Sequence, residues 1–179
     1  MPISKLLVAN RGEIAIRIMR AAAEQNISTV AIYSEDDTTS LHVSKADESV
    51  TLTGAGAPAY LDISQVIDAA KSSGCDAIHP GYGFLSENAD FAQACADTGI
   101  TFVGPTVETL KLFGDKAAAR HAAQRANVPI LPGSDGAVTL DEATRFFDAQ
   151  DGAIIIKALV GGGGRGVRVV KSTDEIGDA

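Results

Sequence analysis

The chain has 179 residues, of which 45% are hydrophobic and 21% charged, and this ordinary globular composition excludes a disordered chain. At about 100 to 200 residues per domain, the length predicts one full domain and little more. Lys and Arg number 15 against 23 Asp and Glu, so the net charge of −8 argues against nucleic-acid binding.

No run approaches the ~20 apolar residues of a membrane span, and the first residues do not form a secretory signal. Cys75 and Cys95 have neither a metal-binding nor a redox spacing. We therefore predict a cytoplasmic protein with two reduced thiols, no membrane segment and no metal ligands.

The region from Lys5 to Val103 alternates short apolar runs with amphipathic segments, which is typical of strand, crossover helix and parallel strand. It predicts an α/β fold with a parallel sheet. Asp62 and Gln65 have the spacing of a capping box, and Gly74 suits the residue just past a helix end. The expected strands are 5–10, 28–34, 48–53, 76–79 and 100–104, and the expected helices are 14–25, 62–73 and 87–97.

Beyond Gly104, two short helices, 106–113 and 115–125, follow each other with no strand between them. We place a domain boundary after them, at 131/132. A helix over 140–149, a glycine-linked hairpin of 153–158 and 166–171, and the start of a helix at 172–175 complete the pattern. Because roughly 50 residues are too few to enclose a second core, the second domain is expected to be incomplete.

A run of four glycines lies at the tip of the expected hairpin: Gly161, Gly162, Gly163 and Gly164. Backbone N–H groups that approach phosphate oxygens explain such a run, and a flexible tip without a ligand explains it equally well. Lys157 ends a strand that is expected to be buried, and a buried lysine needs a counter-charge, which a phosphate would supply. The alternative is a lysine at the strand edge whose amine reaches water. Lys116 begins a helix, where the dipole disfavours a cation unless phosphate binds; a solvated lysine beside Asp115 is the alternative.

Residues 77–88, AIHPGYGFLSEN, follow a strand at the sheet edge where parallel sheets bind ligands. Gly81 and Gly83 flank Tyr82, so the backbone can approach a ligand closely. His79 is either a general base or a hydrogen-bonded histidine at a strand end. A rigid turn whose aromatic side chains pack on a neighbouring element explains the segment without a ligand.

One stripe of the first helix carries charges of both signs, from Glu13, Arg17, Arg20 and Glu24. Such a stripe is either a solvated face or a contact across a two-fold axis.

The segments VANRGEIAIRI, AIHPGYGFLSEN, FVGP, GDK, VPILPGSDG and IIIKA followed by GGGGRG occur in one order along the chain. In this order they resemble the amino-terminal part of biotin carboxylases, the ATP-grasp component of acetyl-CoA, propionyl-CoA, pyruvate and urea carboxylases. The resemblance covers essentially all of the chain. It implies a Rossmann-like pre-ATP-grasp domain over 1–131, followed by an incomplete ATP-grasp B (lid) subdomain over 132–179.

The resemblance also implies roles for the residues selected above. Lys116 and Lys157 would contact ATP phosphates, and Gly163 and Gly164 would supply backbone donors, so the whole run 161–164 is assigned to the nucleotide. Tyr82 with Gly83 would lie at the biotin side. Arg17, Arg20 and Glu24 would belong to a homodimer interface. Leu159 and Val160 depart from the family, which usually has small residues there.

The implied activity is ATP- and bicarbonate-dependent carboxylation of biotin on a carrier protein, with Mg²⁺, and with a biotin carboxyl carrier domain and a carboxyltransferase as partners. The family's magnesium-binding glutamates, catalytic arginine and bicarbonate-holding residues have no counterpart here, so the chain alone is expected to be an inactive fragment with a weak homodimer or none. One rival is an ATP-grasp ligase of the carbamoyl-phosphate synthetase type. Another is a stand-alone pre-ATP-grasp module for binding or assembly, without catalysis.

Overall fold

The computed structural model describes residues 2–134, 136–150, 152–158 and 166–178. The chain packs as two units, Met1–Gly114 and Asp115–Ala179. The first unit contains a five-stranded sheet that is parallel throughout, as the sequence predicts, and its strand order is β3-β2-β1-β4-β5. Its strands are β1 (Lys5–Val8), β2 (Ser28–Tyr33), β3 (Glu48–Thr51), β4 (Ala77–His79) and β5 (Thr101–Phe102), and its α-helices are α1 (Gly12–Ala23), α2 (Ala57–Tyr60), α3 (Ile63–Ser72), α4 (Ala89–Asp97) and α5 (Val107–Gly114).

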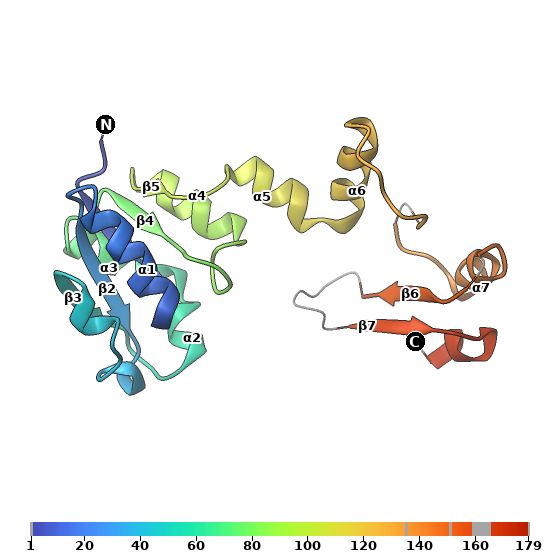
Figure 1. Cartoon of the computed structure of the whole chain (residues 1–179), viewed down its shortest axis with the longest axis horizontal. Helices are drawn as coiled ribbons and strands as arrows, with labels where there is room; N and C mark the ends of the chain where they lie inside the picture. The colour runs from blue at the N-terminus through green and yellow to red at the C-terminus, as the bar shows by residue number, and fades with distance from the viewer. Residues whose placement is uncertain (1, 135, 151, 159–165, 179) are drawn as a thin grey trace. The chain divides into compact units, whose positions relative to one another are not determined.

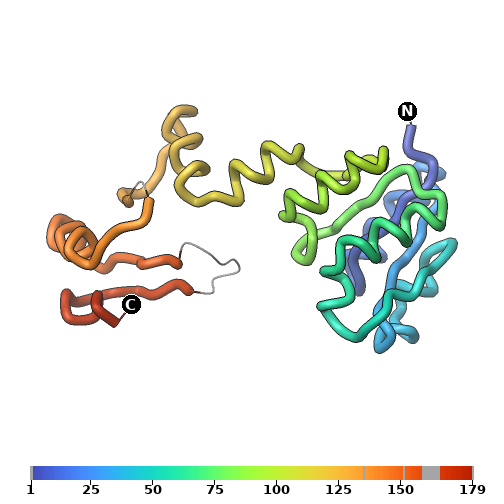
Figure 2. The backbone as a smooth tube through the Cα atoms, turned by 180° about the vertical axis from the view of Figure 1, so that it is seen from behind, coloured from blue at the N-terminus to red at the C-terminus, as the bar shows by residue number. Residues whose placement is uncertain are grey.

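Both faces of this sheet are covered, because its strands point alternate apolar side chains to opposite sides. Leu6 and Val8 of β1 pack with the buried face of α1, whereas Leu7 packs on the other side with α3 and α4. Figure 1 shows α1 on one face of the sheet, and Figure 2 shows the opposite face with α3. The doubly covered parallel sheet is the Rossmann-like arrangement expected from the sequence.

Local signals set the helix ends. The Asp62 carboxylate accepts from the Gln65 backbone N–H at 3.1 Å, and the Gln65 side-chain amide donates back at 3.0 Å, so the predicted start of α3 is confirmed. Gly74 has φ +67° after the helix end, the left-handed conformation that favours glycine. α4 begins at Ala89, later than predicted, because Asn88 is its N-cap and accepts from the Phe91 N–H at 2.9 Å.

The second unit contains α6 (Lys116–Arg125), α7 (Leu140–Asp148), β6 (Ile154–Lys157), β7 (Val167–Val170) and the 3-10 helix η3 (Thr173–Asp178). β6 and β7 pair antiparallel, which confirms the predicted hairpin. A small core forms where α7 and η3 pack on one face of the hairpin, from Ala143, Ile154, Val170 and Ile176. The unit starts before the boundary expected at 131/132, because α6 packs with the residues that follow it.

Within the described ranges, none of the helices is long and apolar enough to cross a membrane.

Candidate functional site

The first candidate site lies at the carboxyl ends of β1 and β4. These strands are neighbours in the sheet, while β2 and β3 lie on the far side of β1, so the strand order reverses between β1 and β4. In open α/β sheets this is where ligands bind. Asn10 follows β1 and reaches the turn after β4, where its Nδ2 donates to the carbonyls of Pro80 at 2.8 Å and Tyr82 at 2.9 Å.

Tyr82 projects from this turn with 63% of its surface exposed. Its hydroxyl donates to Oε1 of Glu13 on α1 at 3.2 Å, and this hydrogen bond to a carboxylate raises the pKa of Tyr82. Gly83 has φ +64° and open space where a Cβ would stand. The structure therefore brings Tyr82 and Gly83 together at an accessible position, and it turns Glu13 of the charged stripe toward Tyr82.

His79 has a structural role in this turn. Its Nδ1 accepts from the Gly81 backbone N–H at 3.0 Å, and burial lowers the pKa of its ring. A lowered pKa keeps the imidazole neutral at pH 7. Of the two interpretations of His79, the hydrogen-bonded strand-end histidine is the one observed.

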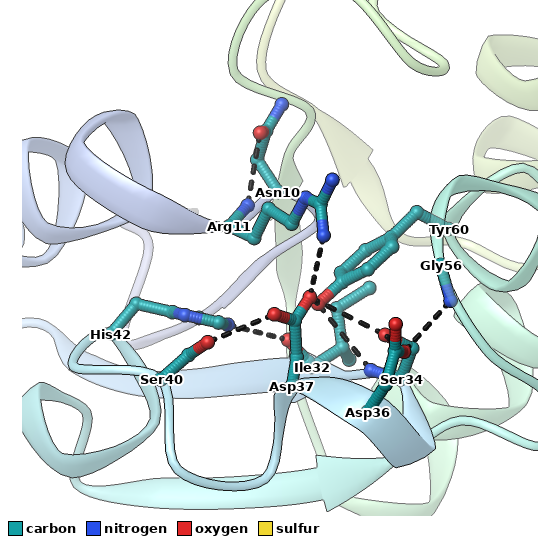
Figure 3. Close-up of polar contacts among 10 residues, drawn as sticks. All are labelled: Asn10, Arg11, Ile32, Ser34, Asp36, Asp37, Ser40, His42, Gly56 and Tyr60. Carbon is teal, nitrogen blue, oxygen red and sulfur yellow. Dashed lines mark hydrogen bonds and ion pairs between the residues drawn. The ribbon is translucent and has the colours of Figure 1, made fainter.

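A polar network next to Asn10 was not predicted from the sequence (Figure 3). Burial would raise the pKa of Asp37, but hydrogen bonds from Arg11 at 2.9 Å, the Tyr60 hydroxyl at 2.8 Å and the Ser40 hydroxyl at 2.9 Å lower it to about 2. The Arg11 guanidinium also lies 5.6 Å from the ring centroid of Tyr60 and 5.9 Å from that of Phe84. The two rings are stacked with centroids 5.1 Å apart.

A pocket of about 420 Å³ lies beside the turn. Arg17 and Ile18 of α1 line one part of it, and His79, Tyr82 and Val103 line another. Tyr82 and Arg17, the first of the three residues assigned to a dimer contact, line the same pocket. Arg17, Arg20 and Glu24 are all exposed.

The second candidate site lies in the second unit, where Lys116 meets the end of β6. The Lys116 Nζ donates to the carbonyl of Ala158 at 3.0 Å, and Ala158 directly follows Lys157. Asp115 caps α6 by accepting from the N–H groups of Ala117 at 2.8 Å and Ala118 at 2.9 Å. Two lysines selected separately from the sequence therefore occur at one end of the hairpin.

The expectation that Lys157 lies in a buried strand is wrong. Lys157 is exposed, and 57% of the surface of Ile155 in the same strand is accessible. Only one face of the hairpin packs on α7 and η3, so alternate residues of β6 face outward. The desolvation argument for a phosphate at Lys157 therefore fails, and the strand-edge alternative describes its surroundings. Leu159, Val160 and Gly161 to Gly164 lie outside the described residues.

Among the residues that the structure describes, no group of three or more His, Cys, Asp or Glu side chains could hold a metal ion. Cys75 and Cys95 are free and buried, and burial raises the pKa of each thiol to about 11, so both are protonated at pH 7.

Residues 2–110 match the model of the biotin carboxylase N-terminal domain. The chain belongs to the biotin carboxylase family. Residues 115–179 match the ATP-binding domain of the carbamoyl-phosphate synthase L chain. The second match begins at Asp115, where the structure divides into its two units. The second unit is therefore the start of an ATP-binding domain.

The relatives are larger proteins. Pyruvate carboxylase of Bacillus subtilis is 55% identical over 99% of this chain, which spans 16% of that protein. Biotin carboxylase of Pseudomonas aeruginosa is 52% identical over 97% of this chain, which spans 39% of that protein. Human mitochondrial pyruvate carboxylase is 54% identical over 98% of the chain, which spans 15% of that protein.

Solved structures of this family have the same fold. A biotin carboxylase from Campylobacter jejuni, described as a complex with β,γ-ATP, superposes with a TM-score of 0.92 at 43% identity, over 98% of this chain and 40% of its own. The biotin carboxylase domain dimer of Hydrogenobacter thermophilus 2-oxoglutarate carboxylase, described with MgADP and bicarbonate, has a TM-score of 0.90 at 44% identity, over 99% of this chain and 40% of its own. The fold expected from the sequence is confirmed.

Proposed function

We propose that this chain is the amino-terminal region of a biotin carboxylase, a ligase that carboxylates biotin on a carrier protein with ATP and bicarbonate. The observation that carries the proposal is the contact of Lys116 with the carbonyl of Ala158, which directly follows Lys157 and stands three residues before the glycine run. ATP supplies the phosphoryl group that activates bicarbonate in this reaction. The chain's own contribution is to bind and orient the nucleotide and biotin.

The residues at the second site fit a polyphosphate. The Lys116 ammonium reaches the carbonyl of Ala158 at 3.0 Å, so its positive charge lies at the end of the hairpin where a phosphate oxygen would bind. Lys157 is exposed at the same end of the hairpin. We assign Lys116, Lys157 and the backbone of Gly161, Gly162, Gly163 and Gly164 to the ATP phosphates.

At the first site, we assign Tyr82 and Gly83 to the biotin side. The exposed ring of Tyr82 and the open space at Gly83 leave room for a bicyclic ligand. Among the described residues, no group of three or more His, Cys, Asp or Glu side chains could hold Mg²⁺. The 179-residue chain by itself is proposed to bind nucleotide without hydrolysing it, since groups that stabilise phosphoryl transfer are not among its motifs.

The proposed partners are a biotin carboxyl carrier domain and a carboxyltransferase. A second copy of the chain would associate weakly through Arg17, Arg20 and Glu24. Two buried free thiols suit a reducing compartment such as the cytoplasm.

ATP binding by calorimetry tests this proposal. Lys116→Ala and Lys157→Ala each remove one charged contact to phosphate, which weakens binding about 10-fold or more. Lys171→Ala is the matched control, because Lys171 is an exposed lysine just past the other end of β7 and should leave the affinity unchanged. Equal affinity of all four chains would refute the assignment.

Experiments on the same purified chain distinguish the proposed function from its two alternatives. Complete absence of ATP binding would favour a stand-alone assembly module. A shift of the Tyr82 ring signals in NMR on addition of biotin distinguishes a biotin carboxylase from a carbamoyl-phosphate synthetase-type ligase. Biotin-stimulated, bicarbonate-dependent phosphate release from the pure chain would contradict the proposed inactivity.

A further inference from the structure

The turn after β4 is held from inside by one buried side chain. Asn10 is 4% exposed, and its amide group uses both ends: Nδ2 donates to the carbonyls of Pro80 and Tyr82, and Oδ1 accepts from the Arg11 N–H at 2.9 Å. A buried amide costs free energy unless its donors and acceptor are paired. The donor and the acceptor of the Asn10 amide are both hydrogen-bonded, so the position of Asn10 and the position of the turn determine each other.

The turn has a backbone that needs such support. Gly81 has φ +68°, Gly83 φ +64° and Phe84 φ +41°, so three of four consecutive residues are left-handed. For a bulky residue such as Phe84 this conformation is strained, and it persists only where surrounding contacts impose it. The ring of Phe84 is anchored by its stack on Tyr60, beneath Arg11.

The fit between Asn10 and the turn is close. A Cβ built at Gly81 would lie 2.7 Å from the Asn10 Nδ2, so only glycine fits opposite the amide. The Pro80 carbonyl belongs to the peptide group that precedes Gly81, and the Tyr82 carbonyl belongs to the peptide group that follows Tyr82. The orientation of the Tyr82 side chain is therefore set by contacts of its backbone, while its ring stays exposed.

We infer that Asn10 is a positioning residue: through the carbonyls of Pro80 and Tyr82 it fixes the turn, so that the Tyr82 hydroxyl meets Glu13 and the ring faces the pocket beside α1. The inference rests on the proposed role of Tyr82 at the biotin side. Without Asn10, the turn loses the two side-chain hydrogen bonds that tie Pro80 and Tyr82 to the segment after β1, and Tyr82 samples positions away from Glu13.

The test measures coupling between Tyr82 and Glu13 in the full 179-residue chain. The pKa of Tyr82 is read by NMR from tyrosine labelled with ¹³C at the ring, and Tyr82→Phe assigns its signal among the three tyrosines. In the otherwise unchanged chain, Glu13→Gln removes the carboxylate charge and lowers the pKa of Tyr82. In the Asn10→Ala chain, we expect Glu13→Gln to have no effect, because the contact is already lost.

Asn88→Ala is the matched control, since the Asn88 side chain caps α4 in the same unit by accepting from the Phe91 N–H at 2.9 Å, whereas Asn10 donates to Pro80 and Tyr82. It should lower stability and leave the effect of Glu13→Gln on Tyr82 intact. Should Asn10→Ala not fold, Gly81→Ala perturbs the same contact from the other side and is predicted to abolish the coupling.

Undiminished coupling in folded Asn10→Ala or Gly81→Ala chains would overturn the inference. No biotin is present in this titration, so its outcome does not depend on whether Tyr82 binds biotin. If the chain does not bind biotin but Asn10→Ala abolishes the coupling between Tyr82 and Glu13, the proposed function is refuted and the positioning role of Asn10 stands.

Discussion

Asp37→Asn should destabilise the first unit in a pH-dependent way. Asp37 is 16% exposed in its side chain and accepts hydrogen bonds from Arg11, Tyr60 and Ser40. Burial alone would raise the pKa of this carboxyl, and the three donors with the charge of Arg11 outweigh it. The amide that replaces the carboxylate keeps the shape of the side chain and loses its charge.

The magnitude follows from the pKa. A fall from the ordinary 3.8 to about 2 in the folded chain corresponds to about 2 kcal/mol of stabilisation by the ionised form. Because the folded-state pKa is the lower one, this stabilisation is fully present above pH ~4 and is lost as the pH falls toward 2. The variant should therefore be less stable by about 2 kcal/mol at pH 7 and close to the parent near pH 2.

Urea unfolding followed by tyrosine fluorescence measures this difference. All three tyrosines lie in the first unit and the chain has no tryptophan, so the signal reports on that unit alone. Glu87→Gln, which removes an exposed carboxylate from the same unit, is the control and should change stability little at any pH. A loss that stays constant from pH 7 to about pH 2, or no loss at pH 7, would refute the reasoning.

Three further changes probe other parts of the molecule. Ile78→Val removes one methylene from the core beside β4, where Ile78 is 0% exposed, and should lower the free energy of unfolding by about 1 kcal/mol in the same fluorescence assay. Asp115→Ala removes the cap of α6 and should cost about 1 kcal/mol, seen as a lower melting temperature of the second unit by circular dichroism. Arg20→Glu should leave folding intact and abolish any dimer in sedimentation, whereas a tight, salt-insensitive dimer that survives it would show that the stripe is only a solvated face.

Features decided by neighbouring residues could be predicted from the sequence. The ends of α3 follow from Asp62, Gln65 and Gly74, which act within one helix, and the structure has all three as expected. The alternation of apolar runs likewise predicts the parallel sheet, because it reflects which side chains can face a core. The proximity of Lys116 to the end of β6 depends on tertiary packing, and it was anticipated only through the resemblance.

Features decided by distant residues could not be predicted. Whether one face of β6 is covered or both depends on which elements pack on it. The apolar run Ile154–Lys157 alone therefore predicts, wrongly, that Lys157 lies in a buried strand. Phe84 is left-handed against its own preference because Tyr60 and Arg11 hold its ring. The sequence Gly81-Tyr82-Gly83 after a strand predicts the turn. No neighbouring residue indicates that the Asn10 side chain would hold this turn.

The strand order has a consequence for synthesis of the chain. β1 lies at the centre of the sheet, with Leu6 beside Thr29 of β2 on one side and beside Ala77 of β4 on the other. At about 5 to 20 residues per second, a ribosome needs roughly two to ten seconds to make the residues between β2 and the end of β4. During that interval the backbone N–H and C=O groups on one edge of β1 stay unpaired, and such edges promote aggregation. The hairpin of the second unit has no such delay, because Ile154 pairs with Val170. A chaperone bound to the nascent chain would therefore help most before His79 emerges.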